Sequence, residues 1–94
     1  MKHTKNIKSY NESHEKLAED ICDLYYDSLA EFFRLLSGKL EKDGKADDGR
    51  GRIKLAKELL SASKDLESAA NHIDVAWEIC EPYVKKWLES KNAN

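Results

Sequence analysis

The sequence predicts an all-α protein built around one long antiparallel helical hairpin. Breakers are few, since the 94 residues include one proline and four glycines. Apolar residues recur three or four positions apart along both halves of the chain, which is the helical period. A glycine-rich stretch between the halves marks the turn. The length and the 40% hydrophobic content fit a single helical domain over residues 1–94.

The first helix is predicted over about residues 10–42, after a frayed segment at 1–8. Ser9 and Glu12 have the spacing of a capping box, which would start the helix near Tyr10. The stripe passes Gly38 without a change of phase, so a continuous helix is expected there. The apolar stripe consists of Leu17, Ile21, Leu24/Tyr25, Leu29, Phe32/Phe33, Leu36 and Leu40.

The second helix is predicted over about residues 49–90, after a loop at 43–51 in which Asp47 or Asp48 caps the helix. It has two core rows in alternating three- and four-residue steps, which is typical of coiled-coil packing. One row is Ala56, Ser63, Ala70, Trp77 and Val84, and the other is Leu59, Leu66, Ile73, Cys80 and Trp87. Pro82 lies opposite these rows, so we expect a kink or short break there. Residues 91–94 are expected to be frayed.

A two-helix hairpin buries only one seam, and both helices carry more apolar surface than one seam covers. We therefore expect the hairpin to dimerise into a four-helix bundle. The alternative is a monomeric three-helix bundle, in which the segment after Asn71 or Glu81 folds back.

Both cysteines of the chain lie in two similar segments, EDICDLYYD at 19–27 and WEICEPYVK at 77–85. Acidic residues three apart share a helix face and can hold a divalent cation, as in all-α nucleotide pyrophosphohydrolases. The candidate ligands are Asp20, Asp23, Glu78 and Glu81. A turn near residue 47 or 48 would put the two segments about seven residues out of register, which is about 10 Å along the helix axis. This offset argues against a metal site and against a Cys22–Cys80 disulfide within one chain.

The composition also restricts the partners. A net charge of −2 with interspersed signs does not favour nucleic-acid binding. No apolar run is long enough for a membrane span, and the N-terminus lacks a secretory h-region. We expect a cytoplasmic protein with reduced thiols and no cofactor.

These observations favour a binding role over catalysis. We expect a small helical interaction module, acting as an adaptor, inhibitor or accessory subunit, that binds another protein and a second copy of itself. Exposed aromatic and apolar side chains are common anchors of such interfaces. The predicted interface residues are Tyr26, Phe33, Val75, Ile79 and Tyr83. A metal-dependent phosphohydrolase that uses the four acidic residues is the alternative.

Overall fold

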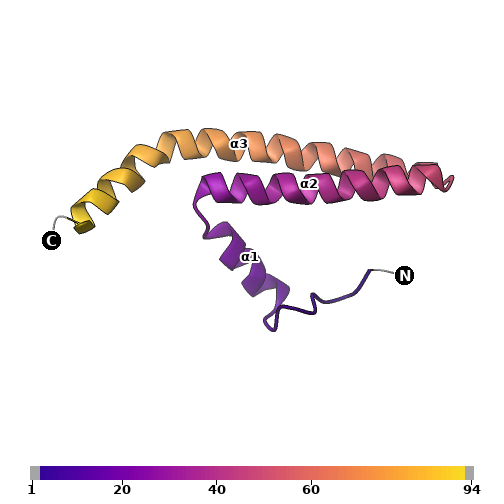
Figure 1. Ribbon diagram of the computed structural model, residues 1–94, viewed down its shortest axis with the longest axis horizontal. Coiled ribbons are helices and arrows are strands. Elements are labelled where there is room, and N and C mark those ends of the chain that lie inside the picture. Colours follow the sequence, from indigo (N-terminus) through magenta and orange to yellow (C-terminus); the bar gives the residue numbers. More distant parts are fainter. Residues whose placement is uncertain (1–2, 93–94) are drawn as a thin grey trace.

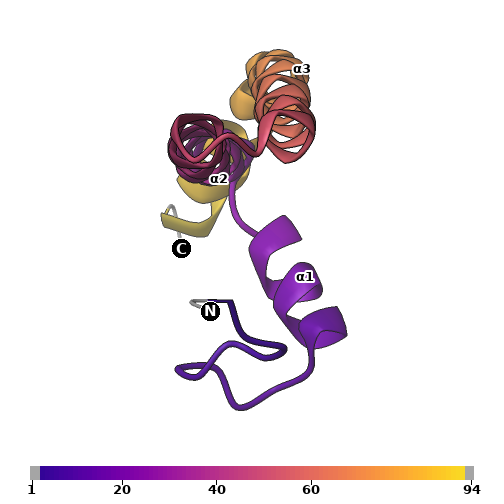
Figure 2. The ribbon, with the colours of Figure 1, turned by 90° about the vertical axis from the view of Figure 1, so that its right-hand side faces the viewer.

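The computed structural model describes residues 3–92, in which the regular elements are three helices: α1 (His14–Cys22), α2 (Tyr26–Gly49) and α3 (Ile53–Asn92). Helices α2 and α3 lie side by side and antiparallel, whereas α1 leans away from the hairpin (Figures 1 and 2). The all-α class and the helical hairpin are confirmed. Because α3 is continuous, the folding back of a segment after Asn71 or Glu81 is wrong.

Small residues form the seam between α2 and α3. The buried residues of α3 are Ala56, Ser63 and Ala70, which confirms the first half of the predicted core row. The buried residues of α2 are Leu29, Ala30, Ser37, Gly44 and Asp47. Because these side chains are short, the two backbones can approach closely, and the helices interact along their shared length.

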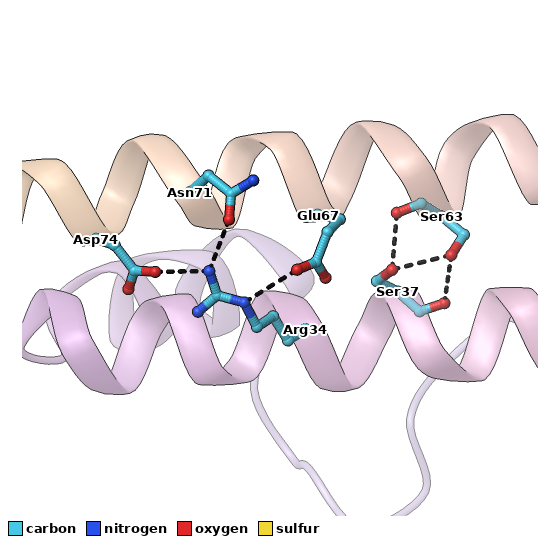
Figure 3. Close-up of polar contacts among 6 residues, drawn as sticks. All are labelled: Arg34, Ser37, Ser63, Glu67, Asn71 and Asp74. Carbon is cyan, nitrogen blue, oxygen red and sulfur yellow. Dashed lines mark hydrogen bonds and ion pairs between the residues drawn. The ribbon is translucent and has the colours of Figure 1, made fainter.

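Two serines tie the helices together at the middle of this seam. Ser37 Oγ donates to the backbone carbonyl of Ser63, and Ser63 Oγ donates to that of Ser37, each over 2.7 Å (Figure 3). Both hydroxyls are buried, so an unpaired one would leave a costly unsatisfied polar group. The reciprocal bonds satisfy both groups and fix the register of α2 against α3.

The turn between α2 and α3 occupies only residues 50–52. Gly51 has a φ of 79°, the left-handed conformation that ends many helices. The N–H of Arg52 donates to the Asp47 carbonyl, and the N–H of Gly51 donates to the Asp48 carbonyl, which is the Schellman pattern. The predicted loop at 43–51 and the capping of the second helix by Asp47 or Asp48 are therefore wrong.

Gly44 lies inside α2 and has a packing role. A Cβ at this position would lie 3.0 Å from Leu60 Cγ and Cδ2, closer than ordinary contact. The glycine lets α3 pass close to α2 and does not break the helix. Gly38 also lies within α2, as expected.

The later turn changes which residues face each other. Ser37 lies opposite Ser63, and the Tyr25 ring stacks on the Trp77 ring. The residues of α2 and Tyr25 therefore face residues of α3 several positions further along than predicted. The predicted offset between the two cysteine-containing segments is therefore wrong. The argument that the two segments stay apart depended on this offset.

The predicted continuous helix over 10–42 is also wrong, because the chain bends at an elbow of residues 23–25. Tyr25 has an extended backbone, and no side chain caps the start of α2. The buried positions Ala30, Ser37 and Gly44 are seven residues apart, and the same spacing leads back to Asp23 and Lys16. A continuous helix would press these charged residues against α3, and burying unpaired charges is unfavourable.

The start of α1 also differs from the prediction. Ser13 is the N-cap, and its Oγ accepts a hydrogen bond from the N–H of Lys16, so the proposed Ser9–Glu12 box is not used. The preceding segment is anchored by Tyr10, whose hydroxyl donates to Asp20 Oδ2 over 2.9 Å. Residues 3–8 are not helical, as expected, and residues 1–2 lie outside the described residues.

Helix α3 continues beyond the start of α2, and this overhang begins after Trp77. It runs through Pro82 without a break and bends in its last turns (Figure 1). Of the two alternatives expected at Pro82, the break is therefore wrong. Trp87 was assigned to the seam but is 56% exposed, because α2 does not reach it. Residues 91 and 92 are helical and not frayed, and residues 93–94 lie outside the described residues.

Ala70→Leu should destabilise the protein, because Ala70 is 0% exposed within the small-residue seam. Overpacking of a tight contact typically lowers the free energy of unfolding by about 1–3 kcal/mol. Urea denaturation followed by circular dichroism measures the change. Ala46→Leu on the exposed side of α2 is the control and should change stability little. Equal effects of the two substitutions would contradict a close-packed seam.

The Tyr10 hydroxyl should lose its proton at a higher pH than an ordinary tyrosine does. Loss of hydration and its hydrogen bond to Asp20 raise the pKa of Tyr10 to about 12, above its ordinary value of about 10. The raised pKa means that this contact stabilises the fold fully below about pH 10 and is lost as the pH rises towards 12. Phenolate absorbance at 295 nm should show a late transition that Tyr10→Phe removes and Asp20→Asn moves to lower pH. A late transition unchanged in Tyr10→Phe would contradict the assignment.

Candidate functional site

The two cysteine-containing segments meet at the open end of the hairpin. An open cavity of about 310 Å³ lies between the elbow and α3. The first segment contributes Cys22, Asp23, Leu24, Tyr25 and Tyr26 to its lining, and the second segment contributes Trp77, Cys80 and Val84. The similarity of the two segments is visible in the sequence, but the predicted turn was placed too early and so put the segments out of register.

A stacked aromatic pair forms one wall of this cavity. The ring centroids of Tyr25 and Trp77 are 5.7 Å apart and their planes differ by 25°. Such pairs contribute about 0.5–1.5 kcal/mol beyond the burial of their area. The stack holds the elbow against α3 and so positions the carboxyl end of α1, where Cys22 is exposed. Cys80 is half-buried on α3, and both thiols are free.

The four candidate metal ligands do not lie together at one site. Asp20 accepts the Tyr10 hydroxyl and pairs with Lys16 at 3.0 Å. The Lys16 and Tyr10 contacts lower the pKa of Asp20, which keeps it ionised. Asp23 caps α1 and lines the cavity, while Glu78 and Glu81 are exposed on α3. Among residues 3–92, no three His, Cys, Asp or Glu side chains form a group that could hold a metal ion.

The five predicted interface residues occupy different environments. Val75, Ile79 and Tyr83 are exposed on α3, Ile79 by 67% and Tyr83 by 73%. Trp87 follows at the same four-residue spacing, and we call Val75, Ile79, Tyr83 and Trp87 the outer ridge. Tyr26 is exposed but lines the cavity. Phe33 is half-buried between buried Ala30 and Ser37, so α3 already covers part of it.

Arg34 forms a polar cluster that sequence reasoning missed. Its Nε donates to Glu67 over 3.2 Å, and its Nη2 donates to Asn71 over 2.9 Å and to Asp74 over 2.6 Å (Figure 3). The hydrogen bonds to Asp74 and then Glu67 raise the pKa of Arg34 further. The spacing of the acceptors, four and three residues apart on α3, was the available signal. This cluster occupies the Arg34 side of the seam, so an apolar partner is expected elsewhere.

Comparison with known proteins found no match to any family model, curated protein or solved structure. Within residues 3–92, none of the helices combines the length and the apolar character needed to cross a membrane. The case for a function therefore depends on the surfaces described above.

Trp77→Ala should loosen the elbow, because it removes the platform on which Tyr25 stacks. Trp77 is only half-buried, so we expect a loss of about 1–3 kcal/mol, less than for a fully buried tryptophan. Limited proteolysis at the exposed Tyr25 and Tyr26 should become faster. Leu35→Ala is the control, since Leu35 is 65% exposed on α2 and lies outside both the cavity and the outer ridge. Unchanged cleavage in Trp77→Ala would show that the stack does not hold the elbow.

Proposed function

We propose that the protein is a cytoplasmic helical interaction module that works as a homodimer, in which the α3 helices of two hairpins pack against each other. The observation that carries this proposal is the large surface of the single chain. Its accessible area is 7879 Å², whereas a compact 10.8 kDa monomer exposes about 5,500 Å². Its radius of gyration is 17.4 Å, against about 12 Å for a compact domain of this length.

The small core explains the excess surface. The buried hydrophobic residues among those described are Leu29 and three alanines, and no large side chain is fully buried. The excess area of about 2,300 Å² is more than the roughly 800 Å² that each partner contributes to a standard protein interface. A second polypeptide that covers part of this surface would supply the core that one hairpin lacks.

The outer ridge is the surface that best suits a partner. It combines two aliphatic and two aromatic side chains in one row on α3. Tyrosine and tryptophan provide large contact areas with few rotatable bonds, and they are enriched among interface anchors. Val75, Ile79 and Tyr83 lie away from the seam, and Trp87 lies beyond the end of α2, so a partner can cover the ridge without opening the hairpin.

The charges along α3 favour a second copy in an antiparallel arrangement. Glu78 and Glu81 make the first half of the ridge acidic, since Asp74 is already paired with Arg34, and Lys85, Lys86 and Lys91 outweigh Glu89 in the second half. A two-fold axis near Ile79 and Tyr83 would place the acidic part of one α3 beside the basic part of the other. Such an isologous contact is the usual form of a dimer. The protein would then act as an adaptor, inhibitor or accessory subunit through its remaining surface.

Ile79→Arg should dissociate the dimer, because the substitution places a charge within the apolar contact. We expect the dissociation constant to rise by about 100-fold or more, as for loss of a central anchor. Sedimentation equilibrium or light scattering should give twice 10.8 kDa for the wild-type protein and 10.8 kDa for the variant. Affinity capture with both forms as bait then shows whether another protein requires the assembled dimer.

Leu35→Arg is the matched control. Leu35 is 65% exposed, nearly the same as Ile79, but it lies on α2 outside the ridge. It should leave the mass unchanged. A monomeric wild-type protein at high micromolar concentration would refute the homodimer, and equal dissociation by both variants would place the interface elsewhere.

A further inference from the structure

Cys22 and Cys80 are the two cysteines of the chain, and both line the cavity at the open end of the hairpin. They come from elements that are distant in sequence, the end of α1 and the beginning of the α3 overhang. The register set by the Ser37–Ser63 pair and the Tyr25–Trp77 stack brings them to the same level along the hairpin. Both are free thiols, and Cys22 is the more exposed.

We propose that Cys22 and Cys80 are a reversible thiol–disulfide pair, which an oxidant such as a peroxide or glutathione disulfide closes across the cavity. The bond would fix the carboxyl end of α1 to α3. It would make the position of α1 depend on the redox state. This pair does not depend on the proposed dimer, because the outer ridge and the cavity involve different residues of α3.

The elbow supplies the movement that the bond requires. A disulfide needs Cα atoms within about 7 Å of each other, whereas no Cα atom of α1 lies within 8 Å of a Cα atom of α3, so Cys22 has to move towards Cys80. Cys22 is the last residue of α1, and residues 23–25 follow it outside any helix. Tyr25, the N-cap of α2, forms no side-chain cap, and α1 has no buried residue to hold it in place. Small rotations of the elbow can therefore bring Cys22 closer without unfolding α2 or α3.

The oxidation balances with hydrogen peroxide. The Cys22 thiolate attacks one peroxide oxygen, the O–O bond breaks, and Cys22 becomes a sulfenic acid as water forms. The Cys80 thiolate then attacks the Cys22 sulfur, the S–O bond breaks, and a second water leaves. One peroxide is reduced to two waters, and two thiols become one disulfide. With glutathione disulfide, the products are the protein disulfide and two glutathione thiols.

The bond should also stabilise the hairpin. The loop that it closes contains all of α2, the turn and more than half of α3, and closing a long loop restricts the unfolded chain. Stability would change most at the open end of the hairpin, where the elbow meets the beginning of the α3 overhang. Reduction would return the elbow to its present freedom.

The test uses the reduced full-length protein at low micromolar concentration, with hydrogen peroxide or glutathione disulfide as the oxidant. Intact mass spectrometry should show a monomer that has lost two hydrogens, and peptide mapping should identify a Cys22–Cys80 link. The melting temperature should rise by at least about 5 °C and return to its original value after dithiothreitol. Cys22→Ser and Cys80→Ser should each abolish both changes.

The matched control moves the first thiol by one helical turn, in the double variant Cys22→Ser with Ala18→Cys. Ala18 is exposed on the same side of α1 but does not line the cavity. Its disulfide should form at least about tenfold more slowly, because the effective concentration at Cys80 is lower. Equal rates in the two proteins would overturn the proposal. So would oxidation that yields only chain-to-chain links or mixed disulfides with glutathione.

Discussion

The close approach of α2 and α3 is the constraint on which the rest of the structure depends. Alanine, serine and glycine at the seam allow the two backbones to come together, and the reciprocal Ser37–Ser63 hydrogen bonds fix one register. A slip of the register would unpair two buried hydroxyls and move Gly44 away from Leu60. The level at which every other pair of residues meets, including Tyr25 with Trp77, follows from this alignment.

The same seam limits the stability of the single chain. Small side chains bury little apolar area, and burial contributes only about 25 cal/mol per Å². The hairpin is consequently long and thin, with extents of 61 × 30 × 15 Å, and its larger apolar residues remain accessible. The Arg34 cluster makes one side of the seam polar, while the outer ridge leaves another side of α3 apolar. This distribution suits a surface that binds another protein better than a catalytic centre.

The elbow separates the part of the chain that packs from the part that can move. Helix α1 is nine residues long and has no buried residue, and a helix of this length has little stability by itself. Its attachment to the hairpin depends on the aromatic stack beside the elbow, whereas the Tyr10–Asp20 contact joins the preceding segment to α1 itself. The proposed disulfide would add a covalent attachment at the boundary between α1 and the hairpin. Association through the outer ridge and oxidation in the cavity would then be separate properties of α3.

The sequence by itself determined the helical class, the hairpin and the first half of one core row of α3, because periodic apolar residues and the scarcity of breakers are local properties. It also identified Ile79 and Tyr83 as surplus apolar residues. Only the tertiary structure decided the place of the turn, since Gly44 is a helical residue packed against Leu60, whereas Gly51 has a positive φ and ends α2. It also decided the elbow, where no breaker stands and the cause is charge at the seam positions Asp23 and Lys16. Both decisions depend on contacts between distant residues, and together they bring Cys22 and Cys80 to one cavity.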